Sequence, residues 1–321
     1  MAFFAIWWAW MNYTWFASAY DNDDTLFRLL TMFIMGGSLT MAVGIGIMFN
    51  SGEFTMVCIG YVIMRVGMII LWLRAAIDDP GHRPTALSYA IGIGLVQIFW
   101  VTFAILKPVE PATVYGLYIV GVVLELAVPI IAERKADTPW HRHHIIERYG
   151  LLNIIVLGET LLAGAIALKR VAGGAFDIAF VHIALSALVI GFSLWWLYFS
   201  RQEHLETNNI KRAFTWGYGH FVIFASGAAV GAGFAVVVDV IAGHAEASLL
   251  VANFAVAIPV ALYMLGLWFV RDRFCLSSPA CFVLPVFSVL VLLVPFTPAS
   301  LEGIAAMTAL SVLARNQLVR I

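Results

Sequence analysis

Apolar residues in this chain form long uninterrupted runs, each closed by a short cluster of polar residues. A helix needs roughly 20 apolar residues to cross the hydrocarbon core of a membrane, and unbroken runs differ from the alternating pattern of barrel strands. We therefore predict an all-α polytopic integral membrane helix bundle with eleven spans. The predicted spans lie near residues 2–17, 27–49, 54–76, 84–106, 111–131, 146–168, 177–199, 212–241, 247–270, 279–296 and 299–314.

Composition supports a membrane protein. Of the 321 residues, 62% are hydrophobic and 12% are charged, whereas a soluble domain carries about 25% charged residues. The lipid bilayer is thus the expected partner, and the net charge of -1 gives no indication of nucleic-acid binding. The first apolar run has no basic residues before it, so we expect a span there and not a cleaved signal.

The distribution of basic residues between loops predicts the orientation. The loops after odd-numbered spans, together with the C-terminal tail, hold fourteen Lys and Arg residues, whereas the opposite loops hold three. Basic residues concentrate on the cytoplasmic side of membrane proteins. We therefore predict a cytoplasmic C-terminus and an outward N-terminus.

An internal repeat is indicated by two tryptophan pairs, Trp7-Trp8 and Trp195-Trp196, each near the end of an apolar run. For these pairs, packing is favoured over a ligand-binding role. Each is followed by a glycine-rich span, then by a span that opens with an acidic residue and closes on a Trp–Arg pattern. Spans one to five thus match spans seven to eleven. We expect two parallel repeats of five and six helices, covering residues 1–135 and 136–321.

The sixth predicted span carries the most specific motif, Glu-Arg-Tyr-Gly at 147–150 followed by Val-Leu-Gly-Glu at 156–159. With the tryptophan pairs and the acidic segment 21–24, this motif resembles the bacterial low temperature requirement A family. The resemblance implies a polytopic protein of the bacterial inner membrane without a settled activity. Family members usually begin one helix earlier, so this chain is expected to lack that helix, which accounts for five helices in the first repeat.

Four ionisable residues lie inside predicted spans: Arg65, Glu125, Glu159 and His220. An ionised side chain at the centre of a bilayer costs at least about 2.5–3.5 kcal/mol, so each of them needs a protein partner or a wet cavity. Glu159 is also close to Arg148 around the helix axis, because eleven residues make almost three turns. With Glu147 at the mouth of the same span, these residues define the predicted substrate or ion pathway.

Two interpretations of these residues remain open. Arg65 with Glu125 or Glu159 can be a structural ion pair that fixes the helix register, or part of a carboxylate–Arg–His relay around a cavity between the repeats. For His220, an interhelical hydrogen bond is favoured over a proton-relay role.

A second group, His143, His144 and Glu147, has the spacing that places side chains on one face of a helix. These three residues are weak candidates for a metal site, since nothing else in the sequence completes a coordination shell. A solvated helix start that contacts lipid headgroups is favoured. We therefore expect no metal and no cofactor.

The leading functional hypothesis is a secondary carrier or permease-like protein that moves a small molecule or protons through a polar core between the repeats. One alternative is a structural or regulatory membrane protein that transports nothing. Another is a membrane-embedded enzyme that acts on lipid headgroups near residues 141–148, although enzyme activity is not favoured.

Overall fold

The computed structural model describes residues 2–106, 109–172, 178–200, 210–276 and 279–319, which contain helices and no strand. Each of the eleven predicted spans coincides with a helix or a run of helical segments. The elements are α1 (Ala2–Tyr20), α2 (Thr25–Ser51), α3 (Thr55–Asp78), α4 (Arg83–Leu106), α5 (Pro111–Ala132), α6 (Arg142–Ala172), α7 (Ile178–Phe199), α8 (Ile210–Ile241), α9 (Leu249–Leu267), a π-helical turn (Trp268–Asp272), α10 (Arg273–Cys275), a 3-10 turn (Ala280–Phe282), α11 (Val283–Leu293), a second 3-10 turn (Val294–Phe296) and α12 (Ser300–Val319).

Length and composition make this a polytopic membrane bundle. Within the described ranges, eight helices are long and apolar enough to cross a membrane, and a shorter apolar helix covers Ala280–Phe296. Large apolar side chains such as Leu39 and Phe49 are exposed on the outside of the bundle, as lipid contact requires.

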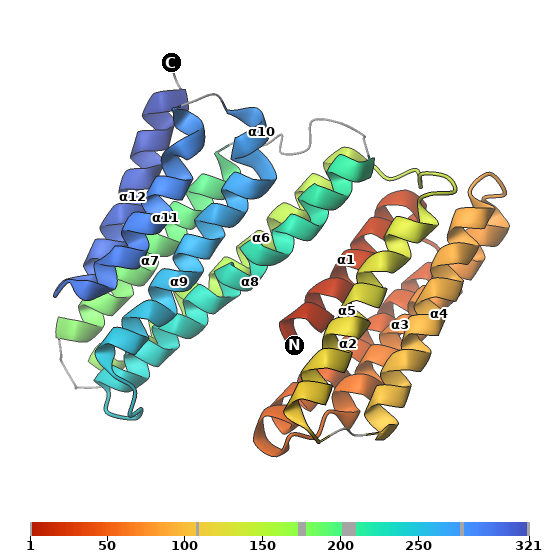
Figure 1. Cartoon of the computed structure of the whole chain (residues 1–321), viewed down its shortest axis with the longest axis horizontal. Helices are drawn as coiled ribbons and strands as arrows, with labels where there is room; N and C mark the ends of the chain where they lie inside the picture. The colour runs from red at the N-terminus through yellow and green to blue at the C-terminus, as the bar shows by residue number, and fades with distance from the viewer. Residues whose placement is uncertain (1, 107–108, 173–177, 201–209, 277–278, 320–321) are drawn as a thin grey trace. The chain divides into compact units, whose positions relative to one another are not determined.

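The chain divides into two compact units, Met1–Ile145 and Ile146–Ile321. The first unit contains α1 to α5, drawn from red to yellow in Figure 1, and the second contains most of α6 and everything after it. The sequence predicts the boundary between the repeats after residue 135, ten residues before the boundary between the units. The duplication itself stays a prediction.

Glycines allow two helix pairs to lie backbone to backbone. In the first unit, a Cβ added to Gly44 of α2 would lie 2.5 Å from the Val57 nitrogen of α3. In the second unit, a Cβ added to Gly233 of α8 would lie 2.1 Å from the Ala255 oxygen of α9. Both approaches need a residue without a side chain. In each unit, the glycine-rich span therefore packs directly on the span that follows it.

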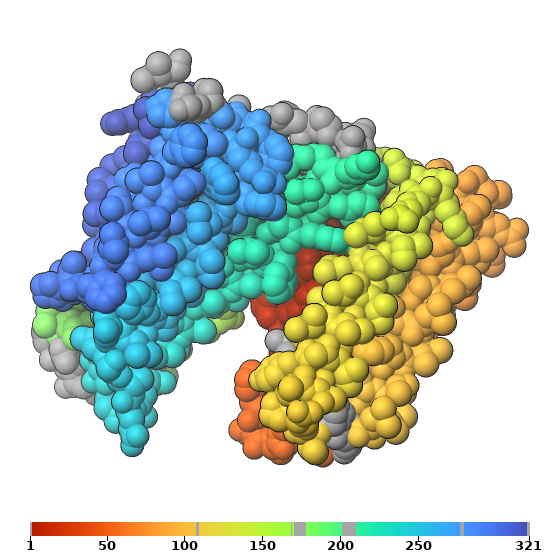
Figure 2. All heavy atoms as spheres, viewed as in Figure 1, coloured from red at the N-terminus to blue at the C-terminus, as the bar shows by residue number. Residues whose placement is uncertain are grey.

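Two local features depart from a regular α-helix. Asp24 caps the start of α2, where its side chain accepts a hydrogen bond of 2.8 Å from the Phe27 nitrogen. At the other end of the chain, α9 continues into the π-helical turn Trp268–Asp272, which holds one residue more per turn than an α-helix would. In the first unit, the side chains of α4 and α5 form one continuous surface (Figure 2).

Candidate functional site

A buried carboxylate on α5 is the centre of the strongest polar cluster in the first unit. The side chain of Glu125 accepts hydrogen bonds from the Trp8 indole nitrogen at 2.8 Å, the Tyr61 hydroxyl at 2.6 Å and the Trp100 indole nitrogen at 3.1 Å. These donors come from α1, α3 and α4. Glu125, a residue that is 2% exposed, therefore joins four helices through one side chain.

Arg65 on α3 supplies the positive charge of this cluster. Its Nη2 lies 3.1 Å from Glu125 Oε2 and also donates to the Tyr61 hydroxyl. Arg65 is ten residues, about 15 Å of helix, from the start of α3 at Thr55, so the pair lies well inside the span. The structure thus brings together two of the four ionisable residues that the sequence places inside spans.

Arg65 and a buried amide on α4 both have polar atoms without a hydrogen-bond partner among the described residues. Arg65 is 1% exposed, yet its Nε and Nη1 have no hydrogen-bond partner among the described residues. Gln97 of α4 is 8% exposed, and both polar atoms of its amide lack a partner in the same part of the chain. Buried polar atoms in proteins are nearly always paired with protein, water or ligand.

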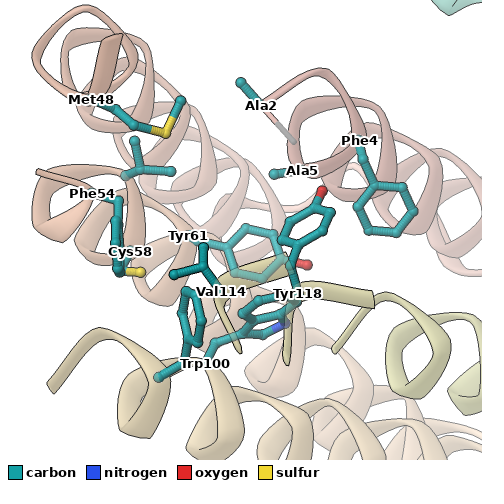
Figure 3. A pocket seen from close by; sticks show the side chains of 12 residues that line it. Ala2, Phe4, Ala5, Met48, Phe54, Cys58, Tyr61, Trp100, Val114 and Tyr118 are labelled. Atoms are coloured by element: carbon teal, nitrogen blue, oxygen red, sulfur yellow. The ribbon is translucent and has the colours of Figure 1, made fainter. Parts of the chain in front are cut away.

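An apolar cavity of about 100 Å³ adjoins the Glu125 cluster. It lies where α1 begins, α2 ends, α3 begins, α4 ends and α5 begins, on the end of the first unit that is predicted to face outward. Figure 3 shows the rings of Tyr61, Trp100 and Tyr118 gathered on one side of it. Tyr61 and Trp100 both donate to Glu125, so the cavity wall and the charged pair share two side chains.

His220 lies in the second unit, in a box of aromatic rings. It is 1% exposed, and the rings of Tyr149, Trp216 and Phe224 lie 5.1, 4.1 and 5.4 Å from its own. Its Nδ1 is 2.8 Å from the Trp216 carbonyl oxygen, one turn earlier in α8. The predicted interhelical hydrogen bond is therefore an intrahelical one, because the main-chain carbonyl four residues back is the nearest acceptor.

Glu159 is exposed on α6 and makes no hydrogen bond or ion pair with another described residue. Its main chain is in contact distance of Gly231 of α8. Tyr149, which touches His220, is ten residues or about 15 Å of helix away, so Glu159 and His220 do not meet. Residue counting along the helix does not show which side of α6 faces its neighbours, and the pathway role of Glu159 stays a prediction.

The start of α6 is a polar surface. Glu147, Arg148 and His143 are exposed, and His144 is half-buried. Over the described residues, no group of three His, Cys, Asp or Glu side chains is arranged to hold a metal ion.

The second unit contains a buried charge cluster that the sequence analysis did not single out. Asp272 binds Arg271 through Nε at 2.5 Å and Arg315 through Nε and Nη2, both at 3.2 Å. Arg271 also donates to the main-chain carbonyl of Leu197 at 2.7 Å. All three residues are at most 2% exposed. The hydropathy pattern places Arg271 and Arg315 in loops, outside the predicted spans. The one sequence feature that points to this cluster is the Arg271-Asp272 pair at the end of an apolar run.

At its other end, the first unit has a polar cavity of about 250 Å³ lined in part by Tyr20, Arg74, Asp78 and Asp79. Arg74 binds Asp24 at 2.6 Å through Nη2 and Asp78 at 3.2 Å through Nε. The hydrogen bond from Arg74, together with that from the Phe27 nitrogen, lowers the pKa of Asp24 to about 2. These contacts join the ends of α2 and α3.

The two tryptophan pairs of the predicted repeat differ in exposure. Trp7 and Trp8 are 2% and 0% exposed, whereas Trp195 and Trp196 are 43% and 51% exposed. The first pair packs inside its unit, and Trp8 serves the Glu125 cluster. The second pair forms part of the surface, so the matching sequence motifs have different surroundings.

Long apolar helices that enclose pairs of ionisable side chains define an integral membrane protein of the polytopic, all-helical class. The chain belongs to the bacterial low temperature requirement A protein (LtrA) family, whose model matches residues 1–315. It is similar to the uncharacterized protein RA0937 of Rhizobium meliloti (strain 1021), with 26% identity over 243 residues. That match covers 68% of this chain and 56% of the relative, so the chain spans little more than half of the relative's length. No solved structure matches the chain.

Proposed function

We propose that this protein is a secondary carrier and that the Glu125–Arg65 pair is the element that responds to substrate and protons. The observation behind this proposal is the incomplete pairing of a buried arginine. Arg65 lies well inside its span, but only one of its three nitrogens is bonded to a described residue.

A purely structural role would favour a different arrangement. Burying two charges costs several kcal/mol per ion, and the attraction between them offsets this only when their remaining hydrogen-bonding groups are also paired. Glu125 meets this condition with its four donors, whereas Arg65 does not. Two buried nitrogens without a partner among the described residues favour a partner that binds and leaves.

The Asp272 cluster of the second unit is closer to the structural arrangement, because Arg271 leaves one nitrogen, Nη2, without a partner among the described residues, against two for Arg65. Its arginines also bind the Leu197 and Tyr198 carbonyls and the Ser200 hydroxyl, at the end of α7. These contacts fasten the ends of three helices to one another. We therefore assign the carrier activity to the first cluster and bundle stability to the second.

The native Cys58 provides a test of alternating access, because it lines the apolar cavity next to Tyr61. In a Cys275→Ser/Cys281→Ser variant, Cys58 is the one remaining thiol. Right-side-out vesicles are treated with a membrane-impermeant maleimide at constant external pH, with and without a proton gradient. A carrier should show a change of several fold in the Cys58 labelling rate when the gradient is imposed.

A matched control places a cysteine at Ser51, an exposed position on the same end of the unit, in a Cys58→Ala background. Its labelling rate should be the same in both conditions. Identical Cys58 rates with and without the gradient would favour a bundle that does not alternate, and would refute the carrier proposal.

A further inference from the structure

We propose that the cavity at Tyr61 and Trp100 binds a small carboxylate with an apolar body, and that this carboxylate replaces Glu125 at Arg65 while Glu125 takes up a proton. This inference deepens the carrier function proposed above and rests on it. It names the substrate class and gives a stoichiometry of one proton for each carboxylate.

The cavity selects the apolar part of the ligand. Aromatic and aliphatic side chains line it, including Phe4, Phe54, Trp100, Phe103 and Tyr118. Its volume of about 100 Å³ is smaller than the roughly 150 Å³ of an engineered cavity that binds benzene. The body of the ligand should therefore be no larger than one aromatic ring or a short branched chain.

The unused hydrogen-bonding groups select the charged part. Each oxygen of Glu125 already accepts two hydrogen bonds, Oε1 from Tyr61 and Trp100 and Oε2 from Trp8 and Arg65. A carboxylate has about four lone-pair positions, so Glu125 has no capacity for a further donor. The open groups on Arg65 are N–H donors, so the missing partner is an acceptor, and a negatively charged one pairs best with a guanidinium.

The amide of Gln97 adds to this capacity. The stacked pairs Phe54–Phe103 and Trp72–Tyr89 set the antiparallel register of α3 and α4. In this register, Gln97 is level with Tyr61, one turn of α3 away from Arg65. Its unpaired NH₂ therefore lies at the depth where a carboxylate would leave the cavity for Arg65.

Tyr61 connects the cavity to the charges. Its ring lines the cavity, while its hydroxyl donates to Glu125 Oε1 and accepts from Arg65 Nη2. A rotation of this side chain would open the way from the cavity to Arg65. Tyr61 is therefore the gate in this proposal.

The exchange balances in charge without any covalent step. In the empty site, Arg65 pairs with ionised Glu125; in the loaded site, Arg65 pairs with the ligand carboxylate and Glu125 carries a proton. The side chains that face Glu125 are Trp8 from α1, Tyr61 and Arg65 from α3, and Trp100 from α4. Arg65 keeps its charge and Tyr61 its proton, so Glu125 is the group that takes up the proton.

Calorimetry on the purified, detergent-solubilised protein tests this exchange with benzoate as the probe. Benzyl alcohol, benzylamine and acetate serve as comparisons that lack the negative charge, reverse it, or lack the ring. We expect benzoate to bind at least about tenfold more tightly than each of them. Titrations in buffers of different ionisation enthalpy should show the uptake of one proton per benzoate, and the affinity should fall about tenfold for each unit of rising pH.

Equal affinity for benzyl alcohol, or benzoate binding without proton uptake, would overturn the inference. A cavity-filling variant then locates the site: Val114→Phe should weaken benzoate binding at least about tenfold, whereas Val101→Phe on α4, outside this cavity, should bind as the native chain does. If Val114→Phe does not fold, Ala5→Val fills the same cavity with less added volume. Native affinity in a folded cavity-filling variant would also refute the site.

The outcome for Cys58 separates this inference from the carrier proposal. Bound benzoate should slow maleimide labelling of Cys58, because both occupy the same cavity. If the Cys58 rate responds to the proton gradient but benzoate does not bind, the carrier function stands and the substrate class is wrong. If benzoate binds with proton uptake while the gradient has no effect on Cys58, the site exists and the carrier function fails.

Discussion

Removing the charge of Glu125 should destabilise the first unit far more than removing the charge of an exposed carboxylate with the same kind of partner. The Arg65–Glu125 pair spans 3.1 Å, with side chains 1% and 3% exposed. The Arg28–Asp23 pair spans 2.9 Å, with side chains 65% and 74% exposed. The exposed pair is held by two hydrogen bonds, from Nε and Nη2 of Arg28, and the buried pair by one from Nη2 of Arg65. A larger loss at the buried pair would therefore come from burial and not from better pairing.

The magnitude follows from what Glu125→Gln leaves behind. Arg65 stays buried without a counter-charge, and the amide nitrogen of the new side chain faces N–H or O–H donors from Trp8, Tyr61 or Trp100. Breaking a buried pair in this way costs about 3–5 kcal/mol. For the exposed pair, Asp23→Asn should produce no measurable change. The double variant Arg65→Met/Glu125→Gln should recover a large part of the loss, because it removes both buried charges.

Unfolding by sodium dodecyl sulfate in mixed micelles, followed by tryptophan fluorescence, measures these free energies. If Glu125→Gln expresses but does not fold, the double variant still reports whether the unpaired Arg65 is the cause. The reasoning would be wrong if Glu125→Gln lost no more stability than Asp23→Asn, or if the double variant were as unstable as Glu125→Gln alone.

Three further predictions concern other parts of the chain. Gly233→Ala places a Cβ 2.1 Å from a main-chain oxygen of α9 and should cost about 1–3 kcal/mol in the same unfolding assay, whereas Gly158→Ala meets nothing within 4 Å and should be neutral or stabilising by up to about 1 kcal/mol. Asp24→Asn keeps the helix cap but removes the ion pair with Arg74. Because the pKa of Asp24 is lowered in the folded protein, the ion pair stabilises the fold above the unfolded pKa of about 4. This stabilisation is lost as the pH falls to about 2. Melting temperatures of variant and native protein should therefore differ at neutral pH and converge at about pH 2, and a difference that persists there would exclude this ion pair as its source. The charge distribution predicts that a cysteine at Asp137 is labelled from the cytoplasmic side and one at Glu53 from outside; the reverse pattern would invert the topology.

The sequence was sufficient to predict the helices. Burial of the main chain in lipid leaves helices as the way to pair its polar groups, so hydropathy alone located a helix or run of helical segments at each predicted span, including those near 279–296 and 299–314. The π-helical turn Trp268–Asp272 was not predictable, because the contact between Asp272 and Arg315 of α12 is a tertiary one.

The site was predictable in part. Arg65 and Glu125 were found because a charge inside an apolar run is costly and needs a partner, and depth can be read from residue counts. The donors Trp8 and Trp100 were missed, since an indole in an apolar run has no signature that distinguishes a hydrogen-bond donor from a packing residue. The exposure of Glu159 was not predictable, because it depends on which neighbours cover α6, and that is a tertiary property.

The extra residue in the turn Trp268–Asp272 has a consequence for how this family can diverge. A π-helical turn differs from an α-helical one by a single residue, so one codon gained or lost in this stretch changes its type. Loss of that codon would rotate all later side chains of the helix by about 100° and move Asp272 away from Arg315. Related chains that differ by one residue here should thus also differ at their counterpart of Arg315.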